Sequence, residues 1–304
     1  MSELPLPPAT RTLGSSGIAI SPIAWGMWRL AEEGRTVREA SRLVHAALAA
    51  GITLLDTADI YGFDGKLGFG DAEGLLGEVL AAEPGLRGRM VLATKGGIMP
   101  PLPYDQSPGY LTAAIDASLR RLRTDVIDLW QVHRPDILAH PGEVARVLDD
   151  AVAAGKIRTL GVSNFTVPQT AALNQFLTNQ LVSTQPEISP LRIDSFENGE
   201  LDQAMMLGLT PLAWSPLGGG RLAQPASERD RAVAAALDTV AKHQGVSRTV
   251  AAYSWLMAHP AGIVPIIGSQ RAERISEGVE ALKVRWTRQD WYAVLVAARG
   301  VPLP

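Results

Sequence analysis

Short apolar runs alternate with longer amphipathic stretches along almost the whole chain. Eight of the short runs are rich in β-branched and aliphatic residues and have turn residues around them, a pattern that predicts strands. The eight predicted strands cover residues 23–25, 53–55, 90–93, 126–130, 159–162, 181–183, 211–213 and 263–267.

Helices are predicted between these strands. Residues 37–50 place apolar side chains at helical spacing, residues 141–154 form a second such stretch, and Gly51 and Gly155 follow them as stop signals. Further helices are predicted to begin near Asp71, Tyr110, Val167, Glu197, Glu228 and Arg271.

Continuous apolar strands joined by helices indicate a parallel sheet buried on both faces. Eight such repeats within roughly 250 residues favour a closed (β/α)8 TIM barrel. The alternative, an open doubly wound sheet, normally carries a glycine-rich phosphate turn after its first strand, and residues 25–28 (Trp-Gly-Met-Trp) form no such turn. We therefore predict an α/β fold, with one barrel domain over residues 1–304.

Two segments lie outside the repeat. Residues 11–20 are predicted to form an N-terminal β-hairpin around Gly14 to Gly17, and this hairpin is expected to plug the barrel bottom. Residues 286–299 are predicted to form an extra C-terminal helix.

Composition narrows the classes of protein. The chain has 46% hydrophobic and 19% charged residues and a formal net charge of -3, so charge alone gives no reason to expect nucleic acid or a membrane surface as partner. It has no cysteine, which excludes disulfides and thiolate chemistry. The first residues lack the pattern of a signal peptide and no run is long enough to span a membrane, so a cytoplasmic protein is the expectation.

Polar residues follow the apolar runs, at the end of the barrel where active sites lie. Asp56 and Tyr61 follow the second strand, Lys95 follows the third and His133 follows the fourth. Each residue alone is a weak signal, because an aspartate often caps a turn and a histidine is often a core residue. Their placement on three consecutive strand ends favours a common site.

These four side chains suit the reduction of a carbonyl by hydride transfer. The reaction leaves an alkoxide, which needs a proton donor within hydrogen-bond reach. Tyr61 is the expected donor, and its ordinary pKa of ~10 would be lowered by Lys95, which Asp56 keeps charged. His133 would orient the carbonyl oxygen or share the proton transfer.

Several segments resemble the signatures of the aldo-keto reductase superfamily, in particular its bacterial single-domain NADPH-dependent oxidoreductases. The spacing of the four residues matches the family tetrad, and the similarity extends over essentially the whole chain. The segments are residues 54–62 (LLDTADIYG), 93–97 (ATKGG), 131–136 (QVHRPD), 161–165 (GVSNF), 213–220 (AWSPLGGG) and 265–269 (PIIGS) followed by Glu273-Arg274.

This resemblance implies a nicotinamide site. Ser163, Asn164 and Gln185 would bind the carboxamide, and Trp214 would stack on the ring where many relatives have tyrosine. The other implied cofactor-binding residues are Gly26 and Met27 at the ribose, with Asp56 nearby, Ser215, Leu217, Gly218, Gly220 and Arg221 at the pyrophosphate, and Gly268, Ser269, Gln270, Arg274 and Glu277 at the adenosine end.

The adenosine end favours NADPH over NADH. Ser269 and Arg274 match positions that grip the 2′-phosphate, and arginine suits bidentate phosphate recognition. Two positions depart from the family pattern: Gly268 stands where many relatives have lysine, and Gly278 where they usually have asparagine.

The substrate pocket is expected above the nicotinamide, walled by Trp28, Tyr61, Met99, Tyr104 and His133, with residues 98–109 closing over it. Such a pocket suggests a moderately apolar aldehyde or ketone and a tolerant site. The main alternative is an NADPH-binding regulatory or redox-sensing subunit with little turnover. A metal-dependent barrel hydrolase is disfavoured, because only His133 of the five histidines follows a strand. We expect no metal, and a monomer or small homo-oligomer.

Overall fold

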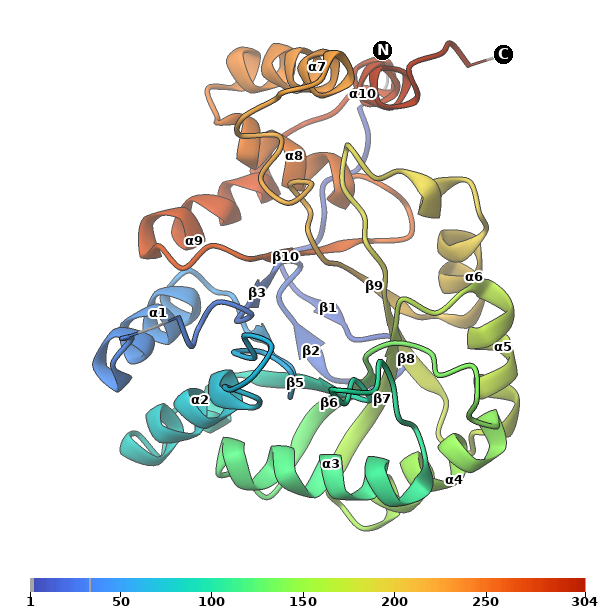
Figure 1. The fold of residues 1–304 in the computed structure, drawn as a ribbon. Helices are drawn as coiled ribbons and strands as arrows, with labels where there is room; N and C mark the ends of the chain where they lie inside the picture. The colour runs from blue at the N-terminus through green and yellow to red at the C-terminus, as the bar shows by residue number, and fades with distance from the viewer. Residues whose placement is uncertain (1–2, 33, 304) are drawn as a thin grey trace.

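A computed structural model describes residues 3–32 and 34–303, and its centre is a closed barrel of eight parallel strands (Figure 1). Each of the eight predicted strands overlaps a barrel strand, so the predicted TIM barrel is confirmed. In barrel order, the strands are β10 (Val264–Ile267), β3 (Ala24–Gly26), β4 (Leu54–Asp56), β5 (Val91–Gly96), β6 (Ile127–Val132), β7 (Ile157–Ser163), β8 (Leu181–Gln185) and β9 (Thr210–Ala213).

Helices surround the barrel, and each barrel strand is followed in the chain by at least one of them (Figure 1). Local signals set their ends: Thr36 and Glu39 form a capping box at the start of α1, and Gly245 ends α7 in a left-handed conformation at φ +69°. The helices are α1 (Val37–Ala49), α2 (Asp71–Ala82), α3 (Pro108–Leu122), α4 (Pro141–Ala153), α5 (Val167–Phe176), α6 (Glu200–Leu207), α7 (Glu228–Gln244), α8 (Arg248–Met257), α9 (Ala272–Gly278) and α10 (Arg288–Arg299).

The segment after Glu228 differs from the prediction of a single helix. It contains α7 and then α8, because Gly245 terminates the first helix and Ser247 caps the second by accepting from the Val250 N–H. Helix α7 packs against the predicted C-terminal helix α10 on one side of the barrel (Figure 1). A third segment therefore lies outside the simple repeat, in addition to the two that were expected.

The N-terminal hairpin is also confirmed. Strands β1 (Arg11–Thr12) and β2 (Ala19–Ile20) pair antiparallel, and the hairpin residues Leu13, Ile18 and Ile20 belong to the same buried cluster as inward-facing barrel residues. The Gly14 N–H donates to Thr210 Oγ1 at 2.8 Å, where β9 begins. The hairpin thus closes the barrel at the end opposite the carboxyl ends of the strands.

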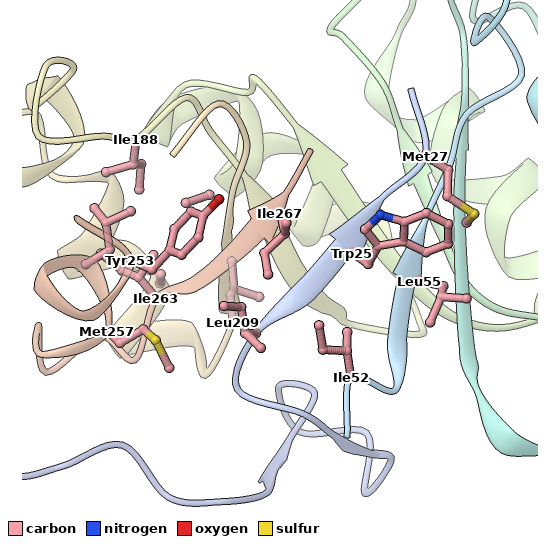
Figure 2. Close-up of a cluster of buried hydrophobic side chains, with 14 of the residues drawn as sticks. Trp25, Met27, Ile52, Leu55, Ile188, Leu209, Tyr253, Met257, Ile263 and Ile267 are labelled. Atoms are coloured by element: carbon pink, nitrogen blue, oxygen red, sulfur yellow. The ribbon is translucent and has the colours of Figure 1, made fainter. Parts of the chain in front are cut away.

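A second, larger apolar core lies between the barrel and its helices. Figure 2 shows part of it, with Trp25 and Ile267 on neighbouring strands and Tyr253 and Met257 on α8. Trp255 of α8 stacks on Trp291 of α10, with ring centroids 4.9 Å apart. This packing holds the strands in register and so fixes the strand ends that carry the polar residues.

Within the described ranges, no helix is both long and apolar enough to cross a membrane.

Candidate active site

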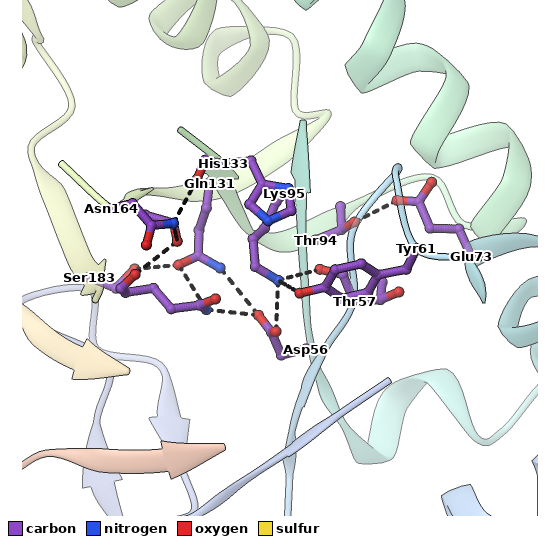
Figure 3. A network of polar contacts seen from close by, with 12 residues as sticks. Asp56, Thr57, Tyr61, Glu73, Thr94, Lys95, Gln131, His133, Asn164 and Ser183 are labelled. Carbon is purple, nitrogen blue, oxygen red and sulfur yellow. Dashed lines mark hydrogen bonds and ion pairs between the residues drawn. The ribbon is translucent and has the colours of Figure 1, made fainter. Parts of the chain in front are cut away.

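The three side chains Asp56, Lys95 and Tyr61 meet at the carboxyl ends of β4 and β5 (Figure 3). The Lys95 ammonium donates to Asp56 Oδ2 at 2.7 Å, to the Thr57 carbonyl at 2.7 Å and to Tyr61 Oη at 3.2 Å. Its three N–H groups are therefore all used. Because Tyr61 Oη accepts from Lys95, the hydroxyl hydrogen of Tyr61 remains available to another acceptor.

Burial and charge act in opposite directions on this cluster. Burial disfavours the Lys95 ammonium, but Asp56 and Tyr61 outweigh burial and raise the pKa of Lys95 above its ordinary value. Burial raises the pKa of Tyr61, and Lys95 lowers it by less than burial raises it. The predicted lowering by Lys95 is thus present but does not decide the sign of the pKa shift, because the effect of burial on Tyr61 is larger.

His133 lies against Tyr61, with the two rings edge to face and their centroids 5.9 Å apart. Burial, helped by the Lys95 and Arg134 charges, holds the pKa of His133 well below its usual range, so the imidazole is neutral at pH 7. Among the described residues, its Nδ1 has no hydrogen-bond partner. A neutral imidazole carries one N–H, so His133 can donate one hydrogen bond to an oxygen in the mouth.

Two buried side-chain amides, one on β6 and one at the end of β8, contact the carboxylate of Asp56. Gln185 Nε2 donates to Asp56 Oδ1 at 3.0 Å, and Gln131 Nε2 donates to the same oxygen at 3.3 Å. Sequence reasoning named Gln185 as a carboxamide ligand but missed Gln131 and Ser183, which lies beside it. The signal for both was a polar residue inside an otherwise buried strand.

The residues predicted to bind the carboxamide are held as a unit. Asn164, at φ +58°, donates to the His133 carbonyl at 3.2 Å and to Ser163 Oγ at 2.9 Å. The Trp214 indole N–H donates to Asn164 Oδ1 at 2.9 Å. Ser163, Asn164, Gln185 and Trp214 are therefore brought to one side of the mouth, and their contact with a cofactor stays a prediction.

The segment after β9 forms a turn that exposes its backbone. Ser215 and the glycines at 218, 219 and 220 all have positive φ, and an added Cβ at Gly219 or Gly220 would meet nothing within 4 Å. Arg221, predicted at the pyrophosphate, pairs with the buried carboxylate of Asp230. Leu217 packs on the outer core, so its predicted contact would be made through its backbone.

Strands β3 and β10 are neighbours in the barrel, and they bring Gly26 next to the predicted adenosine-binding residues that follow β10. Gln270 Nε2 donates to the Gly26 carbonyl at 3.1 Å, whereas Gln270 Oε1 is buried with no partner in the described part of the chain. At Gly268 an added Cβ would lie 3.5 Å from Trp28 Nε1, so the Trp28 indole lies over the position where many relatives carry lysine.

Helix α9 carries Arg274 and Glu277, and both side chains remain at least partly open to solvent. Gly278 at its end packs against Ile267, where a Cβ would collide with Ile267 Cδ1. A larger residue at 278 therefore requires Ile267 to move, which is a physical reason for the departure from asparagine.

The predicted substrate residues divide into two groups. Tyr61 and His133 are in contact, and Met99 lines a groove of about 470 Å³ with Phe63, Phe69 and Tyr110. Trp28 is 52% exposed and lies beside Gly268. Tyr104 is 36% exposed and lies on the loop between β5 and α3. The structure therefore does not gather all five into a single wall.

The loop predicted to close over the mouth is tied down at several points. The Asp105 N–H donates to the Gly97 carbonyl at 3.2 Å, and the Gln106 N–H donates to Asp136 Oδ2 at 3.2 Å. Tyr110 Oη donates to the Ile98 carbonyl at 3.2 Å. The Gln106 bond joins the loop after β5 to the loop after β6, and the other two hold the loop after β5 on itself and on α3.

A buried acidic pair behind the mouth was not predicted. Glu73 accepts from Thr94 Oγ1 at 2.5 Å and pairs with Arg121 at 2.6 Å. Asp59 is fully buried, and neither carboxyl oxygen has a partner among the described residues. Burial, with the charge of Glu73, raises the pKa of Asp59 well above its usual value.

Comparison with known proteins agrees with this geometry. Residues 22–295 match the model of the aldo/keto reductase family, and the chain belongs to that family. Its members generally use a nicotinamide cofactor, so the chain is an oxidoreductase that acts on a carbonyl or an alcohol.

Two curated relatives carry the same name. The chain is 80% identical over 304 residues, the full length of both chains, to a 6-dehydroglucose reductase from Novosphingobium aromaticivorans. It is 40% identical over 296 residues to a 6-dehydroglucose reductase from Agrobacterium fabrum, covering 94% of this chain and 97% of the relative.

Among solved structures, a thermostable aldo-keto reductase, Tm1743, crystallised with the inhibitor epalrestat, has a TM-score of 0.82 at 24% identity. The match covers 95% of this chain and 99% of the other. At this identity the likeness supports the fold.

Proposed function

We propose that the protein reduces the C6 aldehyde of 6-dehydroglucose to a primary alcohol, with NADPH as hydride donor and Tyr61 as proton donor. The observation that carries the reaction type is the Asp56–Lys95–Tyr61 cluster, in which Lys95 donates to Tyr61 Oη and leaves its hydroxyl hydrogen free. The substrate class rests on the relative that is 80% identical over its full length.

The residues around the mouth fit a dinucleotide. In the turn with positive φ at residues 218–220, the Gly218 N–H donates to the Ser215 carbonyl, and Gly219 and Gly220 offer backbone N–H groups without side chains, a geometry that suits phosphates. Gln270 Oε1 is a buried acceptor without a partner in the described residues, so a donor from a bound molecule would satisfy it. Arg271 and Arg274 supply exposed guanidinium groups at the adenosine end, which favours the 2′-phosphate of NADPH.

In the proposed reaction, the carbonyl carbon would receive a hydride, which is the chemistry that a bound reduced nicotinamide would supply. Tyr61 donates its proton to the carbonyl oxygen as negative charge develops there, and the Lys95 ammonium stabilises the resulting phenolate. Asp56 keeps Lys95 in place and charged. The neutral His133 donates to the same oxygen and orients it.

A sugar aldehyde changes the expectation of a moderately apolar substrate. Exposed aromatic side chains such as Trp28 and Tyr104 can pack on the C–H faces of a pyranose while water or polar groups contact its hydroxyls. A polyol therefore suits the same residues.

The test is to mix purified protein with NADPH and 6-dehydroglucose, follow the absorbance of the reduced nicotinamide, and identify glucose as product. A nitrobenzaldehyde in a parallel reaction separates the reaction type from the substrate. We expect turnover of both, with higher kcat/KM for the sugar. Turnover of the aromatic aldehyde alone would reject the sugar, and tight NADPH binding without any turnover would favour the regulatory or sensing alternative.

A further inference from the structure

Gln131 is a polar residue in the middle of an apolar barrel strand. It is fully buried on β6, between Trp130 and Val132, which are also fully buried. Burying a side-chain amide is unfavourable unless its N–H and carbonyl groups find partners. Its partners therefore indicate what the residue does.

The amide of Gln131 connects three other buried residues (Figure 3). Its Nε2 donates to Asp56 Oδ1 at 3.3 Å, and its Oε1 accepts from Gln185 Nε2 at 3.4 Å and from Ser183 Oγ at 3.5 Å. Because Gln185 Nε2 also donates to Asp56 Oδ1 at 3.0 Å, the two amides and the carboxylate form a closed triangle.

The neighbouring strand leaves space for this arrangement. Gly161 on β7 faces the pair, and an added Cβ there would collide with Ser183 Oγ and lie 3.0 Å from Gln131 Cγ. A glycine at this position is thus required by the close approach of Gln131 and Ser183.

We infer that Gln131 is a positioning residue for the reaction: its amide N–H fixes Asp56 Oδ1, so that Asp56 Oδ2 faces Lys95 and Lys95 faces Tyr61. The inference rests on the proposed function, because the rate of carbonyl reduction is the quantity that Gln131 is expected to change. The side chain of Gln131 contacts Asp56, Gln185 and Ser183, and it acts on the reacting atoms only through Asp56.

The physical reason is that the two carboxylate oxygens of Asp56 have different partners. Oδ2 pairs with Lys95 at 2.7 Å, and among the described residues only the two amides hold Oδ1. Hydrogen bonds to a carboxylate favour its charged form. The other titratable groups around the cluster, Tyr61, His133 and Asp59, offer no hydrogen bond to Asp56 Oδ1 within the described residues.

The test compares Gln131→Met with Ser183→Ala. The first removes the donor to Asp56 at similar side-chain length, and the second removes a different bond to the same glutamine and leaves the Asp56 contact intact. We expect Gln131→Met to lower kcat for nitrobenzaldehyde about tenfold, with KM and the NADPH dissociation constant changed less than about twofold.

An activity-independent readout separates this inference from the proposed function. Because Gln131 donates to Asp56 and Ser183 does not, the losses of unfolding free energy in Gln131→Met and Asp56→Ala should be non-additive in urea denaturation. The losses in Ser183→Ala and Asp56→Ala should add. If the parent protein turned over no aldehyde, the proposed function would fall while this difference still tested the contact.

Equal kcat in the two variants would overturn the inference, as would a loss confined to KM or additive losses of stability in Gln131→Met and Asp56→Ala. If Gln131→Met did not fold, Gln131→Leu would replace it in the same measurements. Failure of both to fold, with Ser183→Ala intact, would assign Gln131 a purely structural role and overturn the inference as well.

Discussion

Trp214 donates its indole N–H to the side-chain oxygen of Asn164 at 2.9 Å, and Asn164 in turn donates to Ser163 and to the His133 carbonyl. The tryptophan that stands where many relatives have tyrosine therefore orients the amide expected to recognise the carboxamide.

The change Trp214→Phe keeps an aromatic face and removes the hydrogen bond. We expect it to weaken NADPH binding by about 1 kcal/mol, roughly fivefold, because Asn164 loses the partner that fixes its amide. Calorimetric titration measures the affinity without relying on tryptophan fluorescence. Trp214→Ala, which also removes the ring, serves as the reference for loss of stacking, and an unchanged affinity in Trp214→Phe would show that the bond does not prepare the site.

The hairpin at the barrel bottom is expected to contribute to stability through Gly14. At φ +51°, an added Cβ would collide with the backbone of Val182. Gly14→Ala should therefore destabilise the protein by about 2 kcal/mol or more.

Gly17→Ala is the matched control for this hairpin. Gly17 also has positive φ, at +75°, but an added Cβ there meets nothing within 4 Å, so only the backbone penalty of about 1 kcal/mol remains. Urea denaturation compares the two variants. Equal losses would mean that the hairpin does not seat against β8.

His133 is expected to make the stability of the protein depend on pH, although its own side chain stays neutral in the folded protein at neutral pH. Its pKa is well below 6.5 in the folded protein, because burial and the charges of Lys95 and Arg134 disfavour the cation. The unfolded chain takes up the proton as pH falls below about 6.5, so stability falls in that range. Denaturation near pH 5 and pH 8 should show a smaller change in His133→Gln than in the parent, and the same change in both would show that His133 titrates normally.

Asp59 is expected to change the stability of the protein with pH in the opposite direction to His133. Its raised pKa means that the folded protein holds a proton that the unfolded chain releases, so its contribution to stability is present below about pH 4 and is lost as pH rises through the folded value. Asp59→Asn should gain stability relative to the parent as pH increases, because its amide stays neutral. Parallel stability curves would show that Asp59 is ionised and partnered in the folded protein.

The strand ends could be predicted because parallel barrel strands are continuous apolar runs, and Asp56, Lys95 and His133 each interrupt or follow one. The break between α7 and α8 was missed although Gly245 and Ser247 mark it, since the apolar periodicity continues on both sides. Gln131 was missed for a different reason. Its role depends on which strands face each other across the barrel, and that relationship is set by tertiary packing.

The local sequence pattern also could not give the direction of the net pKa shift of Tyr61. The sequence placed Lys95 near it and so predicted a lowered pKa, whereas the depth of burial, which decides the sign, follows from how the loops after β4 and β5 close around the ring.

The central claim is that Tyr61 supplies the proton. The most direct measurement is a single-turnover reaction of the NADPH-loaded protein with 6-dehydroglucose, comparing the parent with Tyr61→Phe at matched cofactor saturation. We expect the rate to fall by about 100-fold or more, while the NADPH dissociation constant stays within about twofold. A Tyr61→Phe protein that reduced the aldehyde at the parent rate would contradict the account.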